Sequence, residues 1–166
     1  KVTELGSGVA SSLLGAAIGV PAFTREEALA SKKEADARKV NGQPYFLPIL
    51  VKKETSPEDV AAMNISAGIL TAVGGSSSHA MIVAKGRGKP AIAGAPITIN
   101  EQEGWFEIGG VRIHRHEPFT LDAANNLILK GEVGEQGAAA AGIDLPEDFL
   151  TGSRGQGAGN LIDNGR

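Results

Sequence analysis

The stretch that decides the fold runs from Gly68 to Gly94 and reads GILTAVGGSSSHAMIVAKGRGKPAIAG. It predicts a buried strand over 69–73, a Gly-Gly turn, a serine-rich loop, a helix over 79–85 and a short strand over 89–94. Strands that alternate with helices are typical of an α/β fold with a sheet covered by helices. The pattern places His79 in the first turn of its helix, with Ser78 as the N-cap.

His79 begins a helix, and the start of a helix favours anions. The first N–H groups of a helix have no partner within it and carry a partial positive charge. That charge favours the neutral imidazole, which has the lone pair needed to attack phosphorus. Glycines let the backbone approach an anion, and serine hydroxyls can donate to its oxygens. The candidate phosphate-binding residues are Gly74, Gly75, Ser76, Ser77 and Ser78.

A purely structural role competes with this interpretation. A single histidine near the start of a helix is usually structural, and Gly-Ser segments are mostly loops. Three cations farther along, Lys85, Arg87 and Lys89, are expected to serve docking rather than chemistry. The residues alone therefore leave both a phosphocarrier and a structural histidine open.

Upstream of this stretch, the sequence predicts a short strand over 16–23, with Pro21 favouring a sheet edge. Thr24 and Glu27 have the spacing of a capping box, and a charged helix follows until Asn41.

The next apolar run, YFLPILV over 45–51, is expected to form a central strand covered on both faces. Ser56, Pro57 and Asp59 then begin a second helix, which Gly68 ends.

Downstream, the pattern changes to hairpins. Strands over 105–108 and 111–114 flank the tight turn Gly109-Gly110, and strands over 119–122 and 127–130 flank a second turn. Trp105 and Phe106 are interpreted as packing residues of the first hairpin.

These elements predict a compact β/β/α sandwich of the α/β class, with a C-terminal hairpin layer. We expect one domain over 1–150 and a flexible, glycine-rich tail over 151–166.

Composition excludes several functional classes. The 166 residues carry a formal net charge of -3, which argues against nucleic-acid binding. There is no Cys, so disulfide and thiolate chemistry are excluded. No apolar run reaches the roughly 20 residues of a membrane span, and no signal peptide is evident. We therefore expect a cytoplasmic protein with no membrane partner.

The segment ETSPEDVAAMNISAGILTAVGGSSSHAMIVAKGRGKPAIAG, over 54–94, resembles a known family. It is similar to the mobile, swivelling phosphohistidine domain of pyruvate phosphate dikinase and, more loosely, to those of other phosphoenolpyruvate (PEP)-utilising enzymes. The matching core is Gly-Gly, a few residues with Ser, His-Ala, and then Gly-Lys-Pro. The resemblance implies that His79 accepts a phosphoryl group and passes it on.

The same resemblance implies partners and cofactors. A nucleotide-binding domain and a PEP/pyruvate-binding domain, in the same full-length chain or separate, would exchange the phosphoryl group with His79. Magnesium and ATP or PEP are expected on those partner domains, and none of them is expected to bind this chain directly. By itself the chain is not expected to be catalytic.

The sequence also departs from the family. Val73 stands where dikinases commonly have Arg, and Ser77 stands where they usually have Thr, which makes Ser77 a candidate for regulatory phosphorylation. The opening GVASSLLGAAIG lacks the family's proline. Val73 and the unusual tail favour an alternative, in which the chain is a stand-alone, non-catalytic binding or regulatory module that retains the fold.

A metal site is a further alternative. His114 and His116 in HRHE would share one face of a strand, with Glu117 beside them. Two ligands without a clear third are typical of a solvated strand end, so we predict no metal site.

Overall fold

Eleven strands and four helical segments make up the part of the chain that the structure describes, residues 2–4, 10–11, 15–75, 77–125 and 127–130 of a computed structural model. The helical segments are α1 (Arg25–Val40), the 3-10 turn η1 (Pro57–Asp59), α2 (Val60–Ile65) and α3 (His79–Arg87). The strands are β1 (Val2–Glu4), β2 (Ala10–Ser11), β3 (Ala16–Ala22), β4 (Leu47–Lys52), β5 (Gly68–Thr71), β6 (Ala91–Ala93), β7 (Thr98–Asn100), β8 (Trp105–Ile108), β9 (Val111–His114), β10 (Phe119–Asp122) and β11 (Leu127–Lys130).

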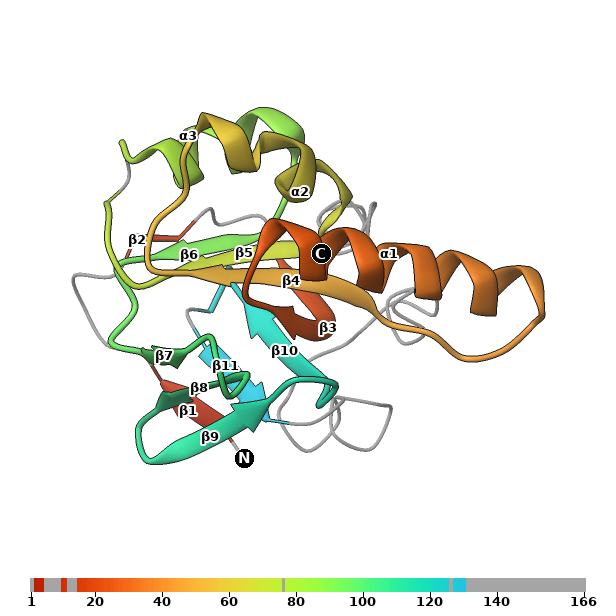
Figure 1. The fold of residues 1–166 in the computed structure, drawn as a ribbon. Coiled ribbons are helices and arrows are strands. Elements are labelled where there is room, and N and C mark those ends of the chain that lie inside the picture. Colours follow the sequence, from red (N-terminus) through yellow and green to blue (C-terminus); the bar gives the residue numbers. More distant parts are fainter. Residues whose placement is uncertain (1, 5–9, 12–14, 76, 126, 131–166) are drawn as a thin grey trace.

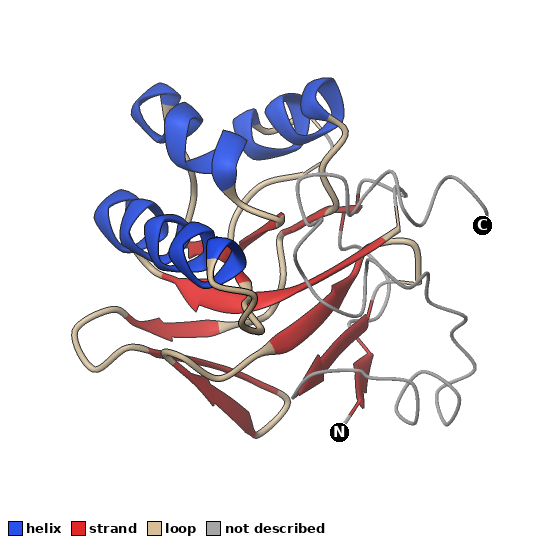
Figure 2. Ribbon diagram, turned by 90° about the vertical axis from the view of Figure 1, so that its right-hand side faces the viewer, coloured by secondary structure: helices blue, strands red, loops and turns tan. Residues whose placement is uncertain are grey.

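The strands form two sheets. The larger has the order β1-β11-β10-β3-β4-β5-β6-β2, and the smaller has the order β7-β8-β9. The helices lie together on one side of the larger sheet, while β8 and β9 lie on the other side (Figure 1). Figure 2 shows the same separation of helices from strands in a view turned by 90°. The α/β fold class predicted from the sequence is confirmed.

The centre of the larger sheet is parallel. β3 pairs with β4, β4 with β5 and β5 with β6, all in the parallel sense. α1, α2 and α3 each connect one of these strands to the next. This arrangement brings the carboxyl ends of β4, β5 and β6 to one edge of the sheet, where α/β proteins usually bind their ligands.

The expectation that Pro21 marks a sheet edge is wrong, because β3 lies between β10 and β4. β10 pairs with β3 only over Ala16 to Gly19, so Pro21 lies beyond the end of that pairing. Pro21 is aligned with Ile49 of the parallel neighbour. A proline is tolerated there because no strand needs its missing N–H on the β10 side.

Of the capping box predicted for α1, the Thr24 half is confirmed, while the Glu27 carboxylate bonds the residue before the cap. The Thr24 hydroxyl accepts the N–H of Glu27 at 3.0 Å, and the Glu27 carboxylate accepts the N–H of Phe23 at 2.8 Å. The helix ends at Val40, and Gly42 follows with a φ of 71°. Only Ala28 and Ala35 of this helix are buried, so it is the mostly solvated helix that the sequence indicates.

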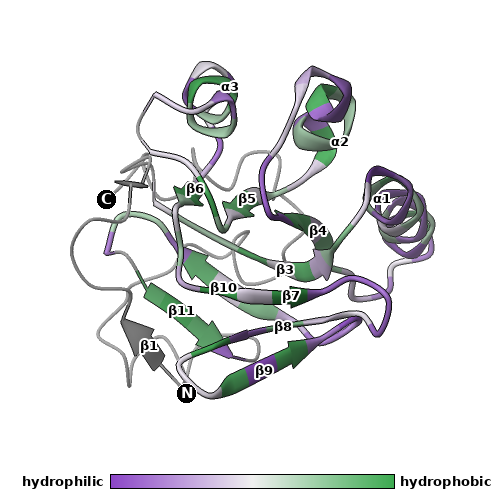
Figure 3. Cartoon of the chain, turned by 60° about the vertical axis from the view of Figure 1, so that its left-hand side comes forward, coloured by the Kyte–Doolittle hydropathy of each residue, from purple (hydrophilic) through white to green (hydrophobic). Residues whose placement is uncertain are grey.

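Two apolar clusters hold the layers together. One lies beneath α2 and α3 and includes Met63, Ile69 and Met81. The other lies on the opposite face of the sheet, where the rings of Phe106 and Phe119 meet edge to face with centroids 5.1 Å apart. Figure 3 shows apolar residues concentrated in the strands and polar residues on the outer surface of α1. Sheet residues therefore contact both clusters, and the sheet is the structural centre.

Both predicted hairpins are confirmed, β8 with β9 and β10 with β11. Gly109 and Gly110 have φ values of 56° and 78°, as a tight hairpin turn requires. Phe106 is buried, and the Trp105 ring stacks against the Arg112 guanidinium at 3.7 Å, so both aromatic residues pack as expected. The predicted tail, 151–166, lies outside the described residues. Among the described residues, no helix is long and apolar enough to cross a membrane.

Candidate functional site

Three loops meet at the carboxyl edge of the parallel strands. The loop after β4 contacts the loop after β5, because the Lys53 carbonyl accepts the N–H of Val73 at 2.9 Å. The loop after β6 joins them, because the Thr71 carbonyl accepts the N–H of Ala95 at 3.0 Å. These backbone bonds fix the three loops relative to one another. His79 therefore begins its helix within a rigid frame.

His79 is the first residue of α3, as predicted, and its side chain is half-buried. Ser78 occupies the N-cap position, but its hydroxyl donates to the Gly75 carbonyl at 2.8 Å and does not cap the helix. The Ser78 carbonyl accepts the N–H of Ile82 at 2.9 Å, which is the first bond of the helix. Because no side chain among the described residues caps the helix, its first N–H groups are available to an anion.

Thr55 contacts the ring of His79, which the sequence did not predict. Its hydroxyl lies 3.0 Å from Nδ1 of His79, and either group is able to donate, depending on the tautomer. Among the described residues, Nε2 of the same ring has no hydrogen-bond partner. The two nitrogens of His79 are thus distinct, because one lies beside a hydroxyl and the other has no partner among the described residues.

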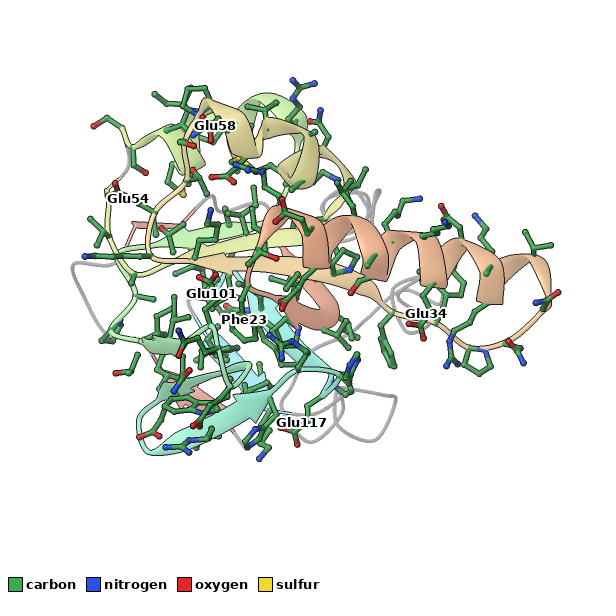
Figure 4. The ribbon with its side chains drawn as sticks, viewed as in Figure 1. Phe23, Glu34, Glu54, Glu58, Glu101 and Glu117 are labelled. Atoms are coloured by element: carbon green, nitrogen blue, oxygen red, sulfur yellow. The ribbon has the colours of Figure 1, made fainter. Side chains whose placement is uncertain are left out.

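A cavity of about 200 Å³ lies beside the ring of His79. Among the described residues that line it, Glu54 is the only acidic or basic one apart from His79, and Val73 supplies an apolar wall. Figure 4 labels Glu54 on the loop that follows β4, far from Glu34 and Glu117. The described residues that line the cavity are Glu54, Thr55, Val73, Gly74, Ser78, His79 and Ala80. A larger cavity, of about 400 Å³, lies between α1 and His116 and does not include His79.

Two of the predicted phosphate-binding residues line this cavity with His79, namely Gly74 and Ser78. Gly75 and Ser77 are exposed and do not line it, and Ser76 lies outside the described residues. Gly74 has a φ of 120°, and a Cβ there would lie 2.8 Å from the Cβ of Ser78. A Cβ on Gly75 would meet nothing within 4 Å. The backbone conformation and the nearby Ser78 therefore require a glycine at position 74, but not at position 75.

The loop that carries Thr55 is held by a buried carboxylate. Asp59 is 1% exposed and accepts the backbone N–H of Ser56 at 2.9 Å. The Lys52 ammonium lies 3.2 Å from the same carboxylate, and Arg25 at the start of α1 lies 3.8 Å away. Burial raises the pKa of Asp59, but the bonds from Ser56 and Lys52 outweigh it and lower the pKa overall. The capping role predicted for Asp59 is confirmed, while its link to His79 through Thr55 was missed.

Of the three cations expected to serve docking, Lys85 and Arg87 are exposed near the end of α3. Lys89 is only 5% exposed, so the expectation of a docking role is wrong for this residue. Burial, together with the charges of Lys32 and Arg87, lowers the pKa of the Lys89 ammonium to about 8. The turn after Arg87 brings the chain back under the helix, because the Lys89 N–H donates to the Ala84 carbonyl at 2.9 Å.

The histidines of HRHE do not share a strand face. β9 ends at His114, and His116 lies in the following turn with a φ of 73°. The Glu117 carboxylate accepts the N–H of His114 at 2.6 Å and is therefore engaged in the turn. Within the described part of the chain, no group of three or more His, Cys, Asp or Glu residues is placed to hold a metal ion.

Comparison with known proteins identifies relatives of this chain. Residues 48–126 match the family described as PEP-utilising enzyme, mobile domain. Pyruvate, phosphate dikinase of Clostridium symbiosum is 38% identical over 129 residues, which are 77% of this chain and 14% of that enzyme. The enzyme of the same name from Rhizobium meliloti is 38% identical over 130 residues, 78% of this chain and 13% of the relative. Pyruvate, phosphate dikinase 2 of Zea mays is 39% identical over 119 residues, 71% of this chain and 12% of the relative.

The matched segment contains the whole of the site described above, from Glu54 through the loop after β6. The chain spans about 14% of the length of the Clostridium symbiosum relative. Most of each full-length relative therefore consists of sequence to which this chain has no match, which implies further domains in those enzymes.

Proposed function

Residues 48–126 are homologous to the mobile domain of PEP-utilising enzymes, and on this premise we propose that the chain carries a phosphoryl group on His79. The observation that supports it best is the contact between the Thr55 hydroxyl and Nδ1 of His79. If Nδ1 donates to this hydroxyl, the lone pair of the ring lies on Nε2, which would then be the nucleophile. Among the described residues Nε2 has no hydrogen-bond partner, so none of them competes for that lone pair.

The transfer step follows from the tautomer. When Nδ1 keeps its proton and donates it to the Thr55 oxygen, the lone pair of the neutral ring lies on Nε2. That lone pair forms the N–P bond, while the bond between phosphorus and the donor's leaving oxygen breaks and its electron pair stays on that oxygen. The proton remains on Nδ1, so the phosphorylated ring is cationic. A cationic ring is a good leaving group, and the reverse step to an acceptor oxygen is then favourable.

The surroundings of His79 suit a phosphoryl group only in part. The start of α3 offers N–H groups and a partial positive charge to the new oxygens. In contrast, the described residues that line the cavity include the carboxylate of Glu54 and no Lys or Arg side chain. Because the helix start attracts the phosphoryl oxygens while the Glu54 carboxylate repels them, these surroundings fit a phosphohistidine that forms transiently better than one that persists. We propose that a partner domain supplies the missing positive charge when it docks.

The partners follow from the relatives rather than from this chain. We propose that a nucleotide-binding domain and a PEP/pyruvate-binding domain exchange the phosphoryl group with His79, and that ATP or PEP and magnesium bind to those domains. Both substrates are cytoplasmic metabolites, so a cytoplasmic location belongs to the same proposal. Alone, this chain would hold the group without turning anything over.

Phosphoramidate tests the proposal, because this small phosphoryl donor needs no partner enzyme. The purified chain would be treated at mildly alkaline pH, where phosphohistidine survives, and the label located by mass spectrometry. We expect His79 to label at least about tenfold faster than an ordinary exposed histidine, as positioning and electrostatic stabilisation each contribute factors of this size. His114 and His116 provide that internal reference.

The His79→Ala variant is the control for site assignment, and it should lose the fast label while keeping the slow one. If His79 labels no faster than His114 and His116, the carrier proposal is wrong. The alternative, a non-catalytic binding or regulatory module that retains the fold, would then be the better account, and the apolar Val73 in the cavity wall would favour it.

A further inference from the structure

We propose that Asp59 is a positioning residue that determines which nitrogen of His79 receives the phosphoryl group, acting through the loop that carries Thr55. The inference rests on the proposed function and extends it to a residue that touches neither His79 nor the cavity. It concerns the site of phosphorylation on the ring, not the ability to be phosphorylated.

Asp59 joins three elements at one buried point. Its carboxylate accepts from Lys52, the last residue of β4, at 3.2 and 3.4 Å. It lies 3.8 Å from the guanidinium of Arg25, the first residue of α1. It also accepts the backbone N–H of Ser56 at 2.9 Å and lies 3.4 Å from the Ser56 hydroxyl. With two cations and an N–H around it, this carboxylate stays charged at neutral pH.

The bond to Ser56 acts directly on Thr55. The N–H of Ser56 belongs to the peptide unit that begins with the Thr55 carbonyl, and a peptide unit is planar. Fixing that N–H therefore fixes the plane that follows the Thr55 Cα. Upstream, the Lys53 carbonyl accepts the N–H groups of Ala72 at 3.1 Å and Val73 at 2.9 Å. Thr55 is thus held on both sides, and its hydroxyl stands 3.0 Å from Nδ1 of His79.

The consequence concerns the orientation of the imidazole ring. While Thr55 is fixed, Nδ1 is engaged and Nε2 faces the donor. If the tie to Ser56 is lost, the Thr55 hydroxyl no longer has a fixed position. The ring then turns more freely, and Nδ1 becomes available to attack phosphorus as well. The two products, phosphorylated on Nε2 or on Nδ1, have distinct phosphorus NMR signals.

The test is to label the intact chain and its variants with phosphoramidate and to measure the ratio of the two isomers by phosphorus NMR. We expect the intact chain to carry the group on Nε2. In Asp59→Ala the Nδ1 share relative to Nε2 should rise about fivefold, the size expected for loss of one hydrogen bond. Asp59→Asn keeps an oxygen that accepts the Ser56 N–H, so it should restore most of the Nε2 preference. A purely structural defect would not be corrected in this way.

Glu58→Gln is the matched control. Glu58 neighbours Asp59 and lies 3.0 Å from the same Arg25, but its side chain is 79% exposed and makes no contact with Ser56. This variant should leave the isomer ratio unchanged. Because loss of Asp59 leaves Lys52 without its partner, Asp59→Ala is checked for folding by thermal melting. If it does not fold, Lys52→Gln carries the test, because it loosens the carboxylate and should raise the Nδ1 share by a smaller factor.

The two proposals fail in different ways. If the intact chain does not label His79, the carrier function is wrong. If the intact chain labels Nε2 and a folded Asp59→Ala variant gives the same isomer ratio, the role of Asp59 is wrong while the carrier function stands. The role of Asp59 is also wrong if Asp59→Asn gives as much Nδ1 product as Asp59→Ala.

Discussion

Thr55 is the single residue on which the chemistry of His79 depends most directly. Replacing it with Val keeps its shape but removes the oxygen that faces Nδ1 at 3.0 Å. We expect Thr55→Val to lower the rate at which phosphoramidate labels His79 by about fivefold, since a typical hydrogen bond contributes about 1 kcal/mol. Nitrogen NMR of the ring should also show that the proton is no longer confined to Nδ1.

Thr55→Ser is the matched control, because it keeps the hydroxyl and removes only a methyl group. Its labelling rate and ring tautomer should stay close to those of the intact chain. Equal rates for the Val and Ser variants would mean that the hydroxyl has no part in the reaction.

The two glycines before the serine-rich loop differ in what they require. At Gly74 an added Cβ would meet Ser78 at 2.8 Å, and the φ of 120° is a conformation that other residues rarely adopt. We expect Gly74→Ala to cost about 1 to 3 kcal/mol in the free energy of unfolding and to disturb labelling of His79. Gly75→Ala should change stability by about 0.5 kcal/mol or less, since its Cβ would meet nothing within 4 Å.

Urea denaturation of the two alanine variants measures this difference, with phosphoramidate labelling as a second readout. Equal losses of stability would contradict the backbone geometry at Gly74. A labelling defect confined to Gly75→Ala would instead point to a direct role of that exposed glycine in docking.

At the scale of elements, Glu27 connects the start of α1 to the hairpin layer. One carboxylate oxygen accepts the N–H of Phe23 at 2.8 Å, and the other accepts from the Arg115 guanidinium at 2.5 Å. Arg115 also donates to the Glu101 carbonyl at 3.1 Å. The Glu27 carboxylate therefore supports the start of α1 and also links it to the hairpin layer, whose residues lie far from Glu27 in the sequence.

We expect Glu27→Ala to lower the free energy of unfolding by about 2 kcal/mol, because it removes the acceptor of the Phe23 N–H and the carboxylate that pairs with the partly buried Arg115 guanidinium. The neighbouring Glu26→Ala is the control, since the Glu26 side chain is 77% exposed and lies 3.9 Å from Arg25. Urea denaturation at neutral pH measures both. A loss of less than about 0.5 kcal/mol for Glu27→Ala would show that the link contributes nothing measurable.

The elements that the sequence predicted are those with local causes. The N-cap of α1, the buried strand over 45–51 and the Gly109-Gly110 turn were predicted from neighbouring residues, and the structure confirms them, with the strand observed as Leu47–Lys52. The short strands β1, β2 and β7 were missed because two or three residues give no periodicity. Their pairing depends on partners distant in sequence.

The candidate site shows the same division. The position of His79 at the start of a helix follows from the local pattern of turn, serines and apolar residues. Its contact with Thr55 joins residues 24 positions apart and depends on β4 and β5 being parallel neighbours. Both residues follow adjacent strands, so the topology of an α/β sheet could have indicated the contact. The capping interpretation of Ser56 and Asp59 was correct. It did not predict that the preceding residue, Thr55, contacts the ring of His79.

At the scale of the whole molecule, the described residues include three buried charged side chains, Asp59, Lys89 and Asp122, and the first two have opposite electrostatic surroundings. Asp59 is 1% exposed and has two cations and an N–H beside it. Lys89 is 5% exposed, has no hydrogen-bond acceptor among the described residues, and lies near the like charges of Lys32 and Arg87. The first charge is stabilised by the fold, whereas the second is tolerated at a cost in free energy.

Lys89 should therefore make the folded state more stable as the pH rises. Its pKa is about 8 in the folded chain against an ordinary 10.5, so between these values the unfolded state binds more protons than the folded one. The free energy of unfolding then increases with pH across this window, and below pH 8 the penalty is fully present. A difference of this size corresponds to a gain on the order of 3 kcal/mol at most.

Urea denaturation from pH 7 to 10.5 would measure this effect in the intact chain and in Lys89→Met, which fills the same space without a charge. We expect Lys89→Met to be more stable than the intact chain at pH 7, by about 1 to 3 kcal/mol, and the two curves to converge as the pH approaches 10.5. Lys85→Met, at an exposed position near the end of α3, controls for other groups that titrate in this range. Parallel curves for the intact chain and Lys89→Met would mean that the buried ammonium has an acceptor and keeps its ordinary pKa. The fold would then stabilise the charge of Lys89 as it does that of Asp59.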